Sequence, residues 1–197
     1  MSCLSKNSKK IGILSSHNGS GYLTIDEACK KGKLKAEVVV VISNNTNAKV
    51  LKIAKNRGTD THVINDKLYP DENLDMKITE LLNKYECDYI FLSGYMKKIE
   101  TNLISTFKNK IINSHPALLP KYGGKGMYGR FVHENIIRAK EKESGVTIHF
   151  VNEEYDKGEF ILQKSIKIEE NCSVDELENN IKELESWSII EAFKKLI

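Results

Sequence analysis

An amide and an imidazole stand two residues apart in the segment 113–116, NSHP, directly after the apolar pair at 111 and 112. Alternate residues of a strand project to the same side, so Asn113 and His115 should be presented together. An Asn amide can donate to a developing oxyanion, and His is well suited to move protons near neutral pH. A lone His at a strand end is usually held by backbone groups, but the neighbouring Asn and the two prolines at 116 and 120 favour a chemical role.

A carboxylate, Asp156, stands further along the chain in the segment 155–158, YDKG. An acid in such a turn is ordinarily exposed to solvent. If Asp156 instead reaches His115, it orients the imidazole and stabilises its charged form. We therefore predict that the pKa of His115 lies above its ordinary value of roughly 6.5, because an ionised carboxylate in contact with the ring outweighs the opposing effect of burial.

A Gly-rich turn, Asn18-Gly19-Ser20-Gly21, follows the first apolar run and precedes a helical stretch. Backbone N–H groups of such a turn, together with a helix N-terminus, can bind an anion. The turn matches neither the P-loop nor the GxGxxG motif, so the sequence does not favour binding of a nucleoside triphosphate or a dinucleotide here. An ordinary turn and a phosphate site remain as the two interpretations.

Apolar and β-branched runs at 11–15, 37–42, 61–64 and 88–92 predict strands, and the stretches 22–31, 48–57 and 71–85 predict helices. Repeats of this length favour a parallel sheet covered on both faces. After residue 113 a Pro/Gly-rich loop, a helix at 130–140, two strands at 145–151 and 159–168 and a final helix are expected. The predicted fold class is α/β, a Rossmann-like, open, mostly parallel twisted sheet with an antiparallel C-terminal addition.

The chain should form a single domain over residues 10–197, after a disordered leader at 1–9 that has no secretory apolar region. Ligands of such sheets bind beyond the carboxyl ends of the strands, where the turns after residues 15, 92 and 115 and the loop at 153–159 should meet.

Composition excludes several classes of protein. The 197 residues are 40% hydrophobic and 29% charged, which is ordinary for a globular chain, and no apolar run is long enough to cross a membrane. The net charge of +3 is scattered along the chain, so no nucleic-acid stripe is expected. The four cysteines form no CxxC pair, which predicts reduced thiols, a cytoplasmic protein and no metal.

These motifs resemble the folate-dependent glycinamide ribonucleotide formyltransferase family. The resemblance rests on HNGSG, SGYMKK, NSHPALLPKYGGKGMYG, SGVTIHFVNEEYDKGEFILQ and Glu185, and it covers the chain from about Ile11 to Ile197. It implies formyl transfer from the co-substrate 10-formyltetrahydrofolate to the amine of glycinamide ribonucleotide, in purine biosynthesis. The partners would be this nucleotide and a reduced folate, without nucleic acid or membrane, and the protein would be a monomer or a homodimer.

The resemblance also implies roles for individual residues and a cis Leu119-Pro120 bond. Asn113, His115 and Asp156 would be the catalytic trio, and Glu185 would lie near the substrate ribose. Gly19, Ser20 and Gly21 would hold the phosphate, and the folate pocket would be lined by Met96, Lys97, Lys98, Ile99, Val151, Asn152 and Glu153.

Four positions or segments depart from the pattern common in this family. One is the loop GGKGMYGRFVHE, which replaces a histidine-bearing version found in many relatives and resembles the loop of another subgroup. Gly21 stands where Asn is frequent, Lys97 stands where Arg is frequent, and the segment 185–188, ESWS, lacks the His and Pro that often follow the Glu. Lys cannot make the planar, two-pronged contact of Arg, so the folate contact at Lys97 would differ.

Three alternatives stay open from the sequence. Methionyl-tRNA formyltransferase shares the Asn-x-His and Asp-x-Gly core and adds a basic C-terminal domain. We expect no such domain in this sequence. Formyltetrahydrofolate deformylase adds an N-terminal module, whereas we expect only about nine residues before the first strand. A non-enzymatic folate- or nucleotide-binding module would tolerate loss of the trio, and all three residues are present.

Overall fold

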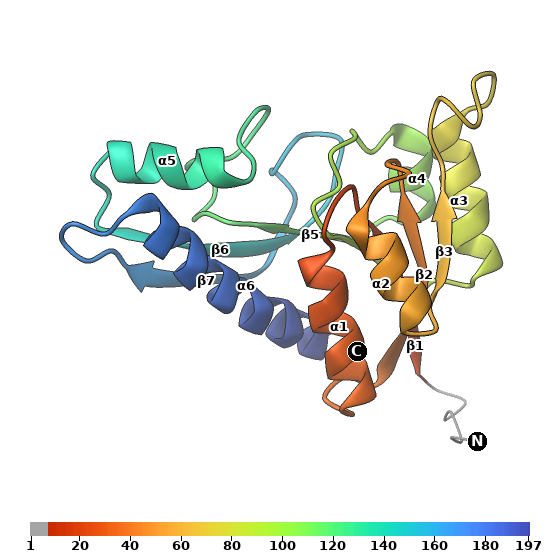
Figure 1. Cartoon of the computed structure of the whole chain (residues 1–197), viewed down its shortest axis with the longest axis horizontal. Coiled ribbons are helices and arrows are strands. Elements are labelled where there is room, and N and C mark those ends of the chain that lie inside the picture. Colours follow the sequence, from red (N-terminus) through yellow and green to blue (C-terminus); the bar gives the residue numbers. More distant parts are fainter. Residues whose placement is uncertain (1–7) are drawn as a thin grey trace. The chain divides into compact units, whose positions relative to one another are not determined.

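The computed structural model describes residues 8–197, so most of the predicted leader lies outside the described residues, and its last residue, Lys9, begins the first strand. The strands are β1 (Lys9–Leu14), β2 (Ala36–Ser43), β3 (Asp60–Val63), β4 (Tyr89–Leu92), β5 (Ile111–His115), β6 (Glu143–Phe150) and β7 (Phe160–Lys167). The helices are α1 (Ser20–Lys30), α2 (Lys49–Asn56), α3 (Leu74–Lys84), α4 (Thr101–Thr106), α5 (Arg130–Arg138) and α6 (Val174–Leu196) (Figure 1).

The chain divides into two compact units, one ending at Ile112 and also including Ile197, the other spanning Asn113–Leu196. Their division falls inside β5, whose first two residues belong to the first unit and whose last three belong to the second. The predicted single domain of residues 10–197 stays a prediction.

The first unit is a parallel sheet with helices on both faces. Strand β1 pairs in parallel with β2 and β4, and β2 pairs in parallel with β3. Ile11, Ile13 and Leu14 of β1 are fully buried, because a strand inside a covered sheet must be apolar on both faces. Helices α1 and α2 lie on one face of this sheet, and α3 and α4 lie on the other (Figure 1). The short helix α4 was not predicted.

The second unit contains an antiparallel pair, β6 and β7, with Glu143 opposite Lys167 and Ile148 opposite Leu162. Helix α6 packs against both strands, and α5 packs against α6. The strand order of the complete sheet is β3-β2-β1-β4-β5-β6-β7. The predicted fold class, mostly parallel with an antiparallel C-terminal addition, is therefore confirmed.

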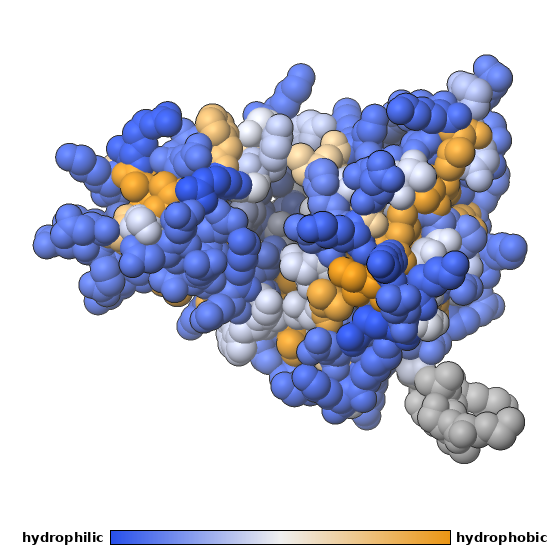
Figure 2. All heavy atoms as spheres, viewed as in Figure 1, coloured by the Kyte–Doolittle hydropathy of each residue, from blue (hydrophilic) through white to orange (hydrophobic). Residues whose placement is uncertain are grey.

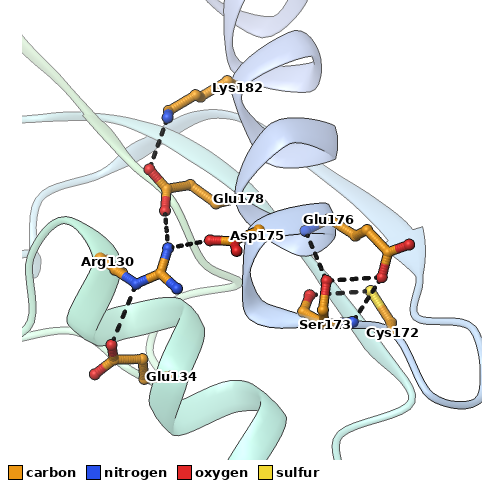
Figure 3. Close-up of polar contacts among 8 residues, drawn as sticks. All are labelled: Arg130, Glu134, Cys172, Ser173, Asp175, Glu176, Glu178 and Lys182. Atoms are coloured by element: carbon orange, nitrogen blue, oxygen red, sulfur yellow. Dashed lines mark hydrogen bonds and ion pairs between the residues drawn. The ribbon is translucent and has the colours of Figure 1, made fainter.

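Helix α6 begins at a capping box. The Ser173 hydroxyl accepts the N–H of Glu176 at 3.2 Å, and the Glu176 carboxylate accepts the N–H of Ser173 at 2.8 Å (Figure 3). These reciprocal bonds satisfy N–H groups that the first turn of a helix otherwise leaves unpaired. Arg130 of α5 bonds Asp175 and Glu178 of α6, so an exposed ion-pair network joins the two helices (Figure 3).

Close packing of β6 against β7 leaves no space for a side chain at Gly145. A Cβ built there would overlap the carbonyl of Lys164 and would lie 2.5 Å from Cδ2 of Leu118. We expect Gly145→Ala to lower the free energy of unfolding by about 1–3 kcal/mol, because the backbone of β7 must move. Urea unfolding measures this loss. Ser165→Ala, at the exposed position opposite Gly145, is the control. Equal stability of both variants would contradict the packing argument.

Hydrophilic residues cover most of the face seen in Figure 2, with apolar side chains in separate patches. Among the described residues, no helix is long and apolar enough to cross a membrane. The cysteines of the described part, Cys29, Cys87 and Cys172, are free thiols, and burial raises the pKa of Cys87 to about 12.

Candidate active site

Strand β5 presents Asn113 and His115 to the same side, as the sequence predicts. Asn113 is half-buried, and His115 is only 3% exposed. Because β5 pairs on both sides within the sheet, the backbone that carries these two side chains is held in an extended form. The two groups are thus presented by rigid backbone.

The loop after β5 is fastened to β6 by one hydroxyl. Thr147 donates from Oγ1 to the carbonyl of Ala117 at 2.7 Å and accepts the N–H of Leu119 at 3.1 Å. Gln163 of β7 donates to the same Oγ1 at 2.9 Å and to the Leu119 carbonyl at 3.0 Å. The predicted cis peptide bond between Leu119 and Pro120 is confirmed.

The His115 ring has one clear proton position. Its Nε2 lies 2.7 Å from the carbonyl oxygen of Tyr122. A carbonyl can only accept, so Nε2 carries a proton and donates it. Nδ1 faces the Asp156 carboxylate, with 3.6 Å between Nδ1 and Oδ2. Tyr122 itself has a φ of 56°, a left-handed conformation that a residue of this size adopts only where its surroundings enforce it.

The prediction that His115 has a raised pKa is wrong. Burial lowers the pKa of His115 below its ordinary value, and the nearby Asp156 charge, which acts in the opposite direction, does not overcome it. The physical reason is that almost no solvent reaches the ring, while the carboxylate lies beyond direct hydrogen-bond distance. In the free protein the neutral imidazole is therefore favoured.

Asp156 contacts both histidines of the site. Its Oδ2 accepts the N–H of Gly124 at 2.8 Å, and its Oδ1 lies 3.6 Å from Nε2 of His149. Burial acts to raise the pKa of Asp156, whereas a proton on the facing nitrogen of His149 or His115 and the Gly124 N–H act to lower it, and the net direction is downward. The predicted approach of Asp156 to His115 is thus present, with an ionised carboxylate beside the ring.

His149 is the member of this cluster that sequence reasoning missed. It lies near the end of β6, is 2% exposed, and its Nε2 is 3.2 Å from the amide nitrogen of Asn113. A signal was available in the sequence. His149 lies two residues after Thr147 and seven before Asp156, so a strand reading of β6 places it on the face of Thr147.

Glu185 lies in α6 and is half-buried. Burial raises the pKa of its carboxyl, whereas the Ser114 side chain acts to lower it. The structure thus places Glu185 beside the residue of β5 that separates Asn113 from His115.

The Gly-rich turn leads directly into α1 within the first unit. Gly19 is the N-cap, with a φ of 71°, and no acidic residue stands in the first turn of the helix. A Cβ at Gly21 would lie 2.5 Å from Cε1 of Phe91 and 3.0 Å from Oγ of Ser93. Glycine therefore fits at this position, and a larger residue would require Phe91 to move.

The segment after β4 lies beside the same turn. The N–H of Met96 donates to Oγ of Ser16 at 2.8 Å, and the N–H of Ser16 donates to the carbonyl of Gly94 at 3.2 Å. Met96 is 43% exposed, and Ile99 is buried. Two further candidates, Lys97 and Lys98, are exposed, and Nζ of Lys97 lies 3.8 Å from a carboxylate oxygen of Asp66.

The remaining folate candidates follow β6 in the second unit. Val151 is half-buried, and Asn152 and Glu153 are exposed. The Asn152 side chain accepts the N–H of Glu154 at 3.0 Å, which shapes the loop that leads to Asp156.

The structure brings the three catalytic candidates, Asn113, His115 and Asp156, into one cluster, which His149 joins. Over residues 8–197, no group of three or more His, Cys, Asp or Glu side chains could hold a metal ion.

The chain is similar to proteins named for formyl transfer. A family model described as "Formyl transferase" matches residues 9–193. A phosphoribosylglycinamide formyltransferase of Haemophilus influenzae is 38% identical over 178 residues, which are 90% of this chain and 82% of that protein. A chloroplastic phosphoribosylglycinamide formyltransferase of Arabidopsis thaliana is 35% identical over 88% of this chain. The chain spans 60% of the length of that plant relative and 61% of the one from Vigna unguiculata.

Solved structures agree in fold. Glycinamide ribonucleotide transformylase 1 of Symbiobacterium toebii has a TM-score of 0.88 and 30% identity, over 96% of this chain and 87% of its own. Phosphoribosylglycinamide formyltransferase of Bacillus halodurans has a TM-score of 0.87 and 31% identity, over 95% of each chain. A formyltetrahydrofolate deformylase of Pseudomonas syringae, at 18% identity, shares the fold alone, with a TM-score of 0.83 over 95% of this chain and 60% of its own.

Proposed function

Because the chain belongs to the formyl transferase family, we propose that it transfers a formyl group from 10-formyltetrahydrofolate to the amine of glycinamide ribonucleotide, in purine biosynthesis. The observation that carries this proposal is the cluster of Asn113, His115 and Asp156, with 3.6 Å between Nδ1 of His115 and Oδ2 of Asp156. The similarity to proteins named for this activity supports the choice of substrates.

The reaction needs hydrogen-bond donors for an oxyanion. When the substrate amine attacks the formyl carbon, the carbonyl oxygen gains negative charge. In this proposal the Asn113 amide and the Nδ1–H of the protonated His115 ring donate to that oxygen, because Nε2–H is donated to the Tyr122 carbonyl. Donors aimed at a developing oxyanion are commonly worth about 3–4 kcal/mol each.

The reaction also needs a path for one proton, from the attacking nitrogen to the departing folate nitrogen. The pKa of Asp156 lies below its ordinary value, so the carboxylate stays ionised and stabilises the proton while it is transferred, directly or through water. Nδ1 of His115 faces Asp156, so a proton on Nδ1 lies between the two groups and is stabilised by the carboxylate. The buried imidazole, neutral in the free protein, takes up on Nδ1 the proton that leaves the attacking nitrogen, is then the charged donor to the oxyanion, and gives the same proton to the departing folate nitrogen.

The substrate phosphate is proposed to bind the backbone N–H groups of Gly19, Ser20 and Gly21, at the N-terminus of α1. We expect a crystal soaked with sulfate to show the anion on these groups. Ser20→Ala, which removes the hydroxyl and keeps the N–H groups, should retain the anion. Density found only on surface lysines would contradict the assignment.

Reduced folate is proposed to contact the segment after β4 and the loop after β6. The exposure of five side chains supports this contact: Met96, Lys97, Lys98, Asn152 and Glu153. Ile99 is buried and Val151 is half-buried, so their contribution would be apolar. Glu185 is proposed to contact the ribose of the nucleotide.

The decisive experiment follows the absorbance of the folate product with and without glycinamide ribonucleotide. Turnover that requires the nucleotide is the expected result. Turnover that ignores the nucleotide would favour the deformylase activity instead. Thermal unfolding separates a folate-only binding module, because glycinamide ribonucleotide should raise the Tm of the formyltransferase as its concentration exceeds Kd and should leave the Tm of such a module unchanged. A nucleotide-binding module without activity would respond in this test and would show no turnover in the absorbance assay.

A cytoplasmic location and a monomeric or homodimeric state complete the proposal. The reduced cysteines support the location. The plant relatives are named chloroplastic, which concerns those proteins. Sedimentation of the purified chain measures the oligomeric state.

A further inference from the structure

Both ring nitrogens of His149 are engaged, although the ring is almost completely buried. Nδ1 lies 2.8 Å from the carbonyl oxygen of Phe150, and Nε2 lies 3.2 Å from Nδ2 of Asn113. The two residues are 36 positions apart in the chain and belong to β5 and β6. No role for His149 is contained in the proposed catalytic trio.

The chemistry of these atoms selects one protonation state. The Phe150 carbonyl can only accept, so Nδ1 carries a proton. The amide nitrogen of Asn113 can only donate, so Nε2 must accept and must be unprotonated. A neutral ring protonated on Nδ1 satisfies both contacts at once. One N–H of Asn113 is then directed at His149, which leaves the second N–H of the same amide for another acceptor.

We propose that His149 is a positioning residue, whose neutral ring holds the Asn113 amide so that its second N–H donates to the oxyanion formed on the formyl group. The proposal rests on the role of Asn113 in the proposed function. Without an acceptor at this position, an Asn side chain can turn its oxygen toward the site, and an oxygen there repels the oxyanion instead of stabilising it.

Two titratable groups face His149: Asp156 from the loop after β6, with Oδ1 3.6 Å from Nε2, and His115 from β5. A second proton on Nε2 would donate toward Asp156 and would meet the N–H of Asn113. The amide would then turn its oxygen to the ring. The arrangement therefore requires a neutral His149.

The absence of a side chain at Gly158 leaves room for the Phe150 carbonyl that accepts the Nδ1 proton of His149. A Cβ at Gly158 would overlap the Phe150 carbonyl, the same group that accepts from Nδ1 of His149. The N–H of Phe150 also donates to the Glu159 carbonyl at 2.9 Å, so the residue that carries this carbonyl is also held through its own N–H. The Asp-x-Gly spacing thus serves the orientation of His149 as well as the placement of Asp156.

Two variants of His149 distinguish the effect of its hydrogen-bond acceptor from the effect of the space that its ring fills. His149→Gln places an amide oxygen near the position of Nε2 and keeps the acceptor, whereas His149→Leu fills the space without one. We expect kcat to fall about 10²-fold in His149→Leu and less than about tenfold in His149→Gln, with the KM of both substrates changed little. His62→Leu removes another hydrogen-bonded histidine, the partner of Tyr85, and should keep wild-type kcat.

A second measurement does not depend on activity. Nitrogen-15 NMR of the wild-type protein should find His149 neutral with its proton on Nδ1. The side-chain amide resonances of Asn113 should be retained in His149→Gln and shifted in His149→Leu. If glycinamide ribonucleotide is not a substrate, the proposed function fails while these spectra still test the positioning.

Three results would overturn the proposal: wild-type kcat in His149→Leu, equal losses in both variants, or a His149 ring protonated on Nε2 in the wild type. Thermal unfolding of each variant identifies any that fails to fold. In that event the wild-type spectrum alone decides.

Discussion

Replacing Asp156 by asparagine is expected to lower kcat by about 10²–10⁴-fold, the usual contribution of a proton-transfer group. The Kd of the reduced folate should change little, because the carboxylate acts on charge that develops during the reaction. Asn keeps the size of the side chain and can still accept the N–H of Gly124. Stopped-flow turnover and folate titration measure the two constants.

The matched control for this variant is Glu154→Gln. Glu154 is an exposed carboxylate of the same loop and pairs only with Lys157 among the contacts described for it. It should retain the wild-type kcat, because no proposed step uses it. Near-full kcat in Asp156→Asn would mean that Asp156 merely shapes its turn.

The same substitution should also lower the pKa of His115 further. In the wild type, burial lowers this pKa and the Asp156 charge raises it, with burial dominant. Removing the charge leaves burial unopposed, so at any given pH the cationic fraction of the ring is smaller in Asp156→Asn. The direction follows because a negative neighbour favours the charged imidazole. NMR titration of the His115 ring in both proteins measures the difference, and an unchanged or higher pKa in the variant would contradict it.

Replacing His115 by alanine is expected to lower kcat by about 10³-fold or more, since it removes an oxyanion donor and a proton carrier together. The KM of glycinamide ribonucleotide should change less, because the phosphate is proposed to bind in the α1 turn. The hydrogen bond to the Tyr122 carbonyl is lost as well, so thermal unfolding must accompany the kinetics.

His133→Ala provides a control of similar burial. His133 is 4% exposed against 3% for His115, and burial lowers the pKa of both rings. If the loss in His115→Ala reflected only the removal of a buried ring, both variants would lose activity alike. Selective loss in His115→Ala is the expected outcome.

The sequence by itself predicted most of the elements of the fold. The buried β-branched run at 37–42 became β2, and the strand–helix alternation predicted the parallel sheet. These signals are local, because burial on both faces demands apolar residues in consecutive positions. The short helix α4 was missed because six residues offer too few turns for an apolar period to emerge.

The candidate trio also followed from the sequence, in part from spacing and in part from resemblance. Asn113 and His115 share a side of β5 because strand side chains alternate. His115 and Asp156 lie on different elements, so the sequence alone does not show whether they meet. The structure supports the approach that the resemblance implied, with 3.6 Å between Nδ1 of His115 and Oδ2 of Asp156.

Only the tertiary structure decided the ionisation of the site and the orientation of its amide. The sign of the His115 shift depends on the balance between burial and one carboxylate, and sequence shows neither the depth of the ring nor the distance to Asp156. The tautomer of His149 depends on the Phe150 carbonyl and on Asn113, and the fit of Gly21 depends on Phe91. Each is an interaction between groups distant in the chain or set by backbone direction, and residue types alone do not determine where such groups meet.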